Sequence, residues 1–212
     1  MHAKRMMRAR SAVVLAILLL AGCTQLKRFA YEGFNRDAWQ KPEEVVQALR
    51  IRPGDRIADI GSGGGYFTFR LAKAVGPGGK VYAADLDEDL NEYVAERSRR
   101  EAQANIEVIL AEPADPRLPL SGTDLLFTSN AYHHIQDRAN YFSNARKYLR
   151  PGGRVAIIEF NGKGWFERLT GHYTSIDLIE KEMRQAGYDL QQQFDFLPRQ
   201  CFLVFSKSGS PG

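Results

Sequence analysis

Cysteine is scarce in this chain, which has only Cys23 and Cys201 among its 212 residues. A disulfide-stapled protein is therefore excluded, and the ordinary shares of hydrophobic (44%) and charged (25%) residues exclude a disordered or collagen-like one. A chain of this length buries about 70% of its unfolded surface, enough for a core without disulfide or metal. Cys201 lies in the apolar run C-F-L-V-F and is expected to be a small buried side chain in a strand, with a nucleophile as the alternative.

The body of the chain also lacks an excess of either charge. Residues 1–22 contain Lys4, Arg5, Arg8 and Arg10 and no acid, so the remaining 25 basic side chains equal the 25 acidic ones. The net charge of +4 thus belongs to the N-terminal segment. A neutral body without a basic stripe argues against nucleic acid as a substrate or partner.

The N-terminal apolar run is too short to span a bilayer. It holds about a dozen residues between Arg10 and Cys23, whereas a spanning helix needs about 20. A basic start, a short apolar stretch and small residues at its end have the layout of a secretory signal. Leu20 to Cys23 reads L-A-G-C and resembles the lipobox of bacterial lipoprotein precursors.

This resemblance implies that Cys23 carries a lipid that anchors the protein to a membrane, at its periplasmic face. Thr24 takes the place of the Asp associated with inner-membrane retention, which favours the outer membrane. The alternatives are the inner membrane, or an uncleaved tail on a cytoplasmic protein. We expect a signal peptide at 1–22, a linker at 23–40, a catalytic domain at 41–206 and a flexible tail at 207–212. Tyr31, Phe34 and Trp39 of the linker either form a lid or pack on a helix.

Apolar β-branched runs alternate with amphipathic segments along the body. Strands are expected at 56–60, 80–85, 106–110, 124–129 and 154–160, and helices at 42–49, 66–75, 88–103, 138–149 and 175–186. Such alternation predicts an α/β fold with a mostly parallel sheet and helices on both faces. The runs 188–196 and 200–205 are joined by a short link, which predicts an antiparallel C-terminal hairpin.

A glycine-rich loop follows the first expected strand, with the sequence D-I-G-S-G-G-G from Asp59 to Gly65. A dinucleotide fingerprint would need glycine where Tyr66 stands, and no G-K-[ST] follows as a phosphate loop requires. The spacing D-x-G-x-G-x-G resembles motif I of class I S-adenosylmethionine (SAM)-dependent methyltransferases. The resemblance extends from about residue 40 to 205. It includes Asp85, the acid at the end of the second expected strand, and the run L-R-P-G-G-R-V that introduces the fifth.

The resemblance implies a Rossmann-like, seven-stranded methyltransferase fold with SAM as cofactor. Asp85 would accept the ribose hydroxyls, Leu86 would pack on adenine, and Asp59 would meet the methionine amino group or orient the loop. The adenine amino group would face Glu112 or, less favoured, Asp115. The complete set of expected cofactor residues is Asp59, Gly61, Ser62, Gly63, Gly65, Asp85, Leu86, Glu112 and Asn130.

The segment N-A-Y-H-H-I after the fourth expected strand would face the reacting methyl group. Tyr132, His133 and His134 are the expected catalytic residues, because a histidine near its ordinary pKa can remove the acceptor's proton. A structural role for one of the adjacent histidines is the alternative, and His172 is a further candidate base. We expect no metal, because no third ligand is in clear register with the histidine pair.

The acceptor is expected to be a small molecule. N-P-P-Y, which marks amino-methylating enzymes, is absent, while Y-H-H-I resembles small-molecule methyltransferases, including relatives of arsenite methyltransferase. Arsenic chemistry is disfavoured because only one cysteine is spare. Trp165, Phe166 and Tyr173 suggest an apolar acceptor pocket.

The predicted function is therefore SAM-dependent methyl transfer by a membrane-anchored enzyme, with no protein partner expected. The alternative is a non-catalytic lipoprotein that uses the fold as a ligand-binding module. SAM is made in the cytoplasm, whereas a lipobox directs the body across the inner membrane. Retention of Asp59, the loop glycines and Asp85 favours the enzyme.

Overall fold

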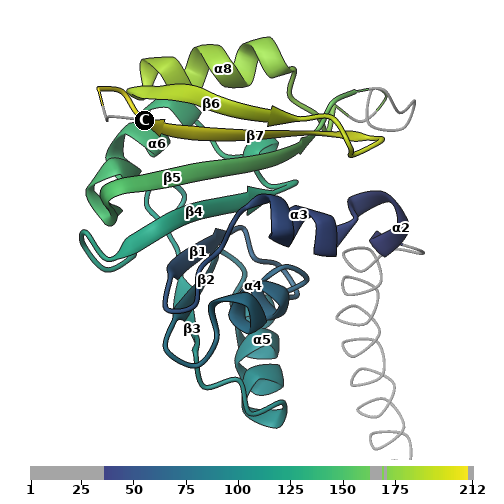
Figure 1. The fold of residues 1–212 in the computed structure, drawn as a ribbon, viewed down its shortest axis with the longest axis vertical. Helices are drawn as coiled ribbons and strands as arrows, with labels where there is room; N and C mark the ends of the chain where they lie inside the picture. The colour runs from purple at the N-terminus through teal and green to yellow at the C-terminus, as the bar shows by residue number, and fades with distance from the viewer. Residues whose placement is uncertain (1–35, 163–168, 170, 210–212) are drawn as a thin grey trace, which may run out of the picture. The chain divides into compact units, whose positions relative to one another are not determined.

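The computed structural model describes residues 36–162, 169 and 171–209, and a seven-stranded sheet forms their centre (Figure 1). The expected leader, Cys23, Tyr31, Phe34, Trp165 and Phe166 lie outside the described residues. The strands are β1 (Arg56–Ile60), β2 (Lys80–Asp85), β3 (Ile106–Leu110), β4 (Thr123–Ser129), β5 (Leu149–Phe160), β6 (Tyr188–Phe194) and β7 (Gln200–Lys207). The helices are α2 (Arg36–Gln40), α3 (Pro42–Ala48), α4 (Thr68–Val75), α5 (Glu88–Arg100), α6 (Arg138–Ala145) and α8 (Ile176–Gln185), with 3-10 turns η1 (Tyr132–His134) and η2 (Arg146–Tyr148).

The strands run in the order β3-β2-β1-β4-β5-β7-β6. The first five are parallel, whereas β7 pairs antiparallel with both β5 and β6. The predicted parallel sheet with an antiparallel C-terminal hairpin is therefore confirmed. The bounds of β1, β2 and β3 are those expected from the sequence.

Both faces of the sheet are covered by apolar side chains of the helices. On one face, residues of α3 and α4, such as Val45 and Leu71, pack against alternate strand residues such as Ile57. On the other face, residues of α6 and α8, such as Phe142 and Met183, form a second cluster. Burial on both faces explains why the inner strands read as continuous apolar runs.

The main difference from the expected elements lies between α6 and β5. The helix expected to reach residue 149 ends at Ala145, and β5 begins at Leu149. Arg150 precedes Pro151, and a residue before proline is disfavoured in helical conformation, so the chain turns through η2 into the strand. Leu149 then pairs with Thr123, the first residue of β4.

Helix α2 forms inside the segment expected to be a linker. Asp37 of α2 accepts a hydrogen bond from the Tyr66 hydroxyl (2.5 Å) and forms an ion pair with Arg70 (3.1 Å). These contacts connect α2 to α4 and to the turn before α4. Among the residues described, no helix combines the length and apolar character that crossing a bilayer requires.

Candidate active site

The carboxyl ends of the five parallel strands meet at one edge of the sheet, where ligands bind in folds of this kind. The glycine loop follows β1 at this edge, Asp85 ends β2, and the histidine-containing turn η1 follows β4. The structure therefore brings together the residues expected to bind cofactor and those expected to face the acceptor.

Asp85 is fixed by the main chain around it. One carboxylate oxygen accepts a hydrogen bond from the Gly63 N–H (2.8 Å), and the other accepts one from the Asp87 N–H (3.0 Å). Next to it, Leu86 is 56% exposed, and Leu110 at the end of β3 is 45% exposed. A fixed, half-buried carboxylate beside exposed apolar side chains fits a ribose with its attached base, as the sequence predicts.

Asp59 is buried behind the glycine loop. Its carboxylate accepts a hydrogen bond from the Thr68 hydroxyl (2.6 Å). Burial raises the pKa of Asp59 to about 7, and nearby Asp85 adds to the rise, although the hydrogen bond from Thr68 opposes it. This carboxyl group therefore changes its protonation state near neutral pH.

The glycine loop touches the loop that follows β4. Gly61 has φ +70°, and a Cβ atom on it would lie 2.4 Å from the Cβ of Ala131. Only glycine permits both this conformation and this approach. The loop expected to hold the cofactor and the loop expected to face the acceptor are thus in direct contact. Ser62, between the first two glycines of the loop, has a buried hydroxyl without a hydrogen-bond partner among the described residues.

Three other predicted cofactor positions are occupied by contacts within the protein. Asp115 accepts hydrogen bonds from Lys147 (2.8 Å) and the Tyr148 hydroxyl (2.5 Å), so it serves the packing of its loop. Glu112 is exposed and pairs with Arg117 (2.9 Å). The side-chain oxygen of Asn130 accepts a hydrogen bond from Gln200 (2.7 Å), which holds Asn130 in its left-handed conformation after β4.

On the acceptor side, His133 is held by a buried carboxylate that the sequence reasoning missed. The Nδ1 atom of His133 lies 2.9 Å from Oε1 of Glu159, and the His133 N–H donates to Oε2 (3.1 Å). Glu159 is fully buried near the end of β5. An acid within the apolar strand run A-I-I-E-F was the available signal, because a charge is rarely buried without a partner.

His172 joins the two adjacent histidines, although it is far from them in the sequence. The ring centroids of His133 and His172 are 5.3 Å apart, and those of His134 and His172 are 5.6 Å apart. Burial lowers the pKa of His134, and the two neighbouring imidazoles lower it further. We call His133, His134 and His172 the histidine cluster. The fold thus brings a third histidine beside the pair that is adjacent in the sequence.

The structure places Tyr132, an expected catalytic residue, in the core. Its side chain is fully buried, stacks on Phe142 and donates a hydrogen bond to Glu182 (2.8 Å). Burial raises the pKa of Tyr132 above its ordinary value, and the bond to Glu182 adds to the rise. A neutral phenol whose hydroxyl already donates to Glu182 is unsuited to proton transfer.

Cys201 is buried, as predicted, and burial raises the pKa of its thiol to about 12.

Helix α2 lies at the same edge of the sheet. Trp39 stacks on Phe160 (centroids 5.7 Å apart), the residue after Glu159, and Gln40 donates to Ser129 at the end of β4 (3.2 Å). The Arg36 guanidinium lies over the Tyr66 ring (3.8 Å) and interacts electrostatically with Asp59. These contacts pack Trp39 against Phe160, next to the buried Glu159.

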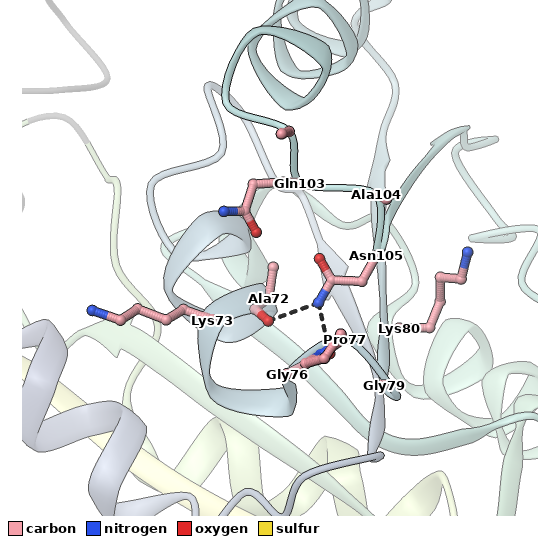
Figure 2. Close-up of a pocket in the computed structure, with 10 residues that line it drawn as sticks. Ala72, Lys73, Gly76, Pro77, Gly79, Lys80, Gln103, Ala104 and Asn105 are labelled. Carbon is pink, nitrogen blue, oxygen red and sulfur yellow. Dashed lines mark hydrogen bonds between the residues drawn. The ribbon is translucent and has the colours of Figure 1, made fainter.

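A hollow of about 420 Å³ lies at the opposite edge of the sheet, at the amino end of β2 (Figure 2). It is lined by the end of α4 and the segment before β3. Figure 2 shows Asn105 donating to the carbonyls of Ala72 (2.8 Å) and Gly76 (2.9 Å), so this side chain caps α4. None of the predicted site residues lines this hollow, and we assign it no part in the chemistry.

Comparison with known proteins decides the family. Residues 51–195 match a family described as a methyltransferase domain. The chain belongs to this family. The methyltransferase domain is 32% identical over 142 residues to an uncharacterized protein in transposon TN4556 of Streptomyces fradiae, covering 67% of this chain and 39% of that protein. It is 26% identical to the ubiquinone/menaquinone biosynthesis C-methyltransferase UbiE of Francisella philomiragia, covering 61% of this chain and 51% of the enzyme.

Solved structures share the fold of the methyltransferase domain. A SAM-dependent methyltransferase from Aquifex aeolicus superposes with a TM-score of 0.76 at 22% identity, covering 87% of this chain and 96% of that one. The seven-stranded class I methyltransferase fold expected from the sequence is thus confirmed. The chain spans between about two fifths and one half of the two curated relatives named above.

Proposed function

We propose that this protein catalyses SAM-dependent methyl transfer to a small, apolar acceptor. The observation that carries the proposal is the contact between Gly61 and Ala131, which joins the glycine loop held by Asp85 to the loop that bears His133 and His134. Cofactor and acceptor residues are thereby neighbours at one edge of the sheet. Membership of the methyltransferase-domain family supports the reaction class.

Each part of the edge has a task in this reaction. Bound SAM supplies an electrophilic methyl group on a sulfonium sulfur. Asp85 would bind the ribose hydroxyls, and ionised Asp59 would face the ammonium group of the methionine moiety. Displacement at a methyl carbon depends mainly on in-line positioning. The histidine cluster lies where an acceptor hydroxyl could donate a hydrogen bond or its proton to a neutral imidazole.

The apolar character of the acceptor rests on exposed side chains that flank His172 in the sequence and on an aromatic pair beside Glu159. Tyr173, next to His172, is 38% exposed, and Leu169 is 75% exposed. Trp39 and Phe160 add an aromatic pair beside Glu159. The UbiE relative is named a ubiquinone/menaquinone biosynthesis C-methyltransferase, which supports testing phenols and quinols first.

The test is a calorimetric titration of the full chain with SAM, followed by an assay for S-adenosylhomocysteine with a panel of phenols, quinols and small amines. We expect micromolar binding of SAM and acceptor-dependent product with at least one phenol or quinol. Binding without turnover on the whole panel would favour the non-catalytic binding module. Failure of the folded chain to bind SAM would contradict the proposal.

We also propose that the protein is a lipoprotein anchored through Cys23, with the outer membrane favoured. The support is the L-A-G-C box after a short apolar run. Cys23→Ser should abolish lipid attachment, so the variant should leave the membrane fraction or accumulate as an uncleaved precursor. Metabolic labelling with a fatty acid checks this directly, with Cys201→Ser as the matched control. Equal labelling of wild type and Cys23→Ser would contradict the anchor.

A further inference from the structure

The histidine cluster has the composition of a metal site. One nitrogen from each of His133, His134 and His172 lies within 4.8 Å of the other two. The rings are not parallel: the planes of His133 and His172 meet at 87°, and those of His134 and His172 at 68°. Inclined rings let three lone pairs point toward one position, whereas stacked rings do not. We propose that the histidine cluster binds a divalent transition-metal ion such as Zn²⁺.

The state of His133 is the second, independent observation. Its Nε2 atom is buried and has no hydrogen-bond partner among the described residues. Its Nδ1 atom is occupied by the carboxylate of Glu159 at 2.9 Å. A proton on Nδ1 leaves the lone pair on Nε2, so the unpartnered atom is an electron-pair donor aimed away from Glu159. A buried polar atom without a partner requires a group that the protein itself does not supply.

Glu159 has the role that a carboxylate takes behind a metal-binding histidine. Metal ligands of this type donate their second ring N–H to a carboxylate, which fixes the tautomer and orients the ring. Glu159 is fully buried and also accepts the main-chain N–H groups of His133 (3.1 Å) and Phe160 (2.7 Å). Its negative charge offsets one of the two positive charges of the ion.

The ligand set favours a particular class of ion. Imidazole suits Zn²⁺ and other late first-row divalent ions, and three histidines with an open position are typical of catalytic zinc. Bonds of about 2.0 to 2.1 Å would bring the nitrogens to about 3.3 Å from one another. The exposed side chains of His134 and His172 can make this approach by rotating, while His133 stays anchored on Glu159.

The metal would change how the acceptor is activated, and this step alone rests on the proposed function. With an ion bound, the lone pairs of the three imidazoles coordinate the metal and cannot accept the acceptor's proton. An acceptor hydroxyl that takes the open position would lose its proton to solvent, and its oxygen would then attack the methyl carbon while the sulfur keeps the electron pair of the broken bond. Acceptors with a hydroxyl oxygen would be favoured over amines.

The experiment measures metal binding without SAM or acceptor, so its outcome is independent of the proposed function. The full chain is freed of metal with a chelator and titrated with Co²⁺, followed by visible absorption, and with Zn²⁺ by competition against a chromophoric chelator. We expect one equivalent of ion and Co²⁺ absorption bands of a site of low coordination number. His172→Ala should weaken binding by about 100-fold or more, and Glu159→Gln by about 10- to 100-fold.

The control variant is Asp189→Asn, which changes an exposed carboxylate of β6. Asp189→Asn should bind the ion as the wild type does. His134→Gln serves as a second exposed-ligand variant, and thermal melting of each variant checks that it is folded. Equal affinity in His172→Ala, His134→Gln and Asp189→Asn, or no stoichiometric binding by the folded wild type, would overturn the metal site.

Discussion

Asp85→Ala should weaken SAM binding by about 2 to 4 kcal/mol, which corresponds to about 30- to 1,000-fold in Kd. The variant removes a charged acceptor from the ribose hydroxyls. It also frees the Gly63 N–H, which Asp85 holds at 2.8 Å, so the glycine loop loses one of its hydrogen bonds to β2 while the bond from the Gly61 N–H to the Ala84 carbonyl remains. Calorimetric titration with SAM measures the loss.

The matched control is Glu88→Ala, which removes the same charge from an exposed position three residues further on. Its affinity for SAM should stay within about twofold of the wild type, since interactions of a solvent-exposed charge contribute little. A folded Asp85→Ala protein with wild-type affinity would remove Asp85 from the cofactor site and would leave the glycine loop without its expected partner.

Asp59→Asn should stabilise the fold at pH 8 while it weakens SAM binding. The pKa of Asp59 is about 7 in the folded protein against an ordinary value of 3.8, because the carboxylate is buried. Between these pH values the folded state holds a proton that the unfolded state has lost, so the free energy of unfolding falls as pH rises. The fall is complete above pH 7. Asparagine carries no ionisation and can still accept the Thr68 hydrogen bond.

The expected gain is about 2 to 4 kcal/mol at pH 8 and close to zero at pH 4, where the wild-type carboxyl is also neutral. Urea unfolding at both pH values measures it. Asp189→Asn, on the exposed face of β6, is the control and should change stability little at either pH. A loss of stability at pH 8, or a gain of equal size at both pH values, would mean that Asp59 is not a buried charge in the folded protein.

The parts of the fold that the sequence predicts well are those in which one local pattern decides the structure. β1, β2 and β3 are short apolar runs bounded by turn residues, and their expected bounds are those observed. The helix expected before β5, at 138–149, is longer than the observed α6, which ends at Ala145. Its apolar periodicity continues past Ala145, but Pro151 and the pairing of Leu149 with Thr123 draw the last residues into a strand.

The candidate site divides in the same way. Asp59, Gly61 and Asp85 lie at or next to the carboxyl ends of β1 and β2, so a motif in the sequence is enough to place them. The places of Glu159 and His172 in the site are harder to predict from the sequence, because both depend on contacts with His133, which is distant from them in the chain. His133 lies 26 residues from Glu159 in the sequence, yet the parallel pairing of β4 with β5 brings their side chains to 2.9 Å. The sequence does not show that the turn η1 directs the Tyr132 ring into the core, because this direction depends on the fold around the turn.

The contact between Gly61 and Ala131 has a mechanical consequence for catalysis. At Gly61 the loops after β1 and β4 meet through the methyl group and Cα atom of Ala131, neither of which can change rotamer. In the proposed reaction, the separation of methyl donor and acceptor is then set by the scaffold, which close packing makes stiff. Selection could reshape the surrounding acceptor side chains for new substrates while the reach of the methyl group stays constant.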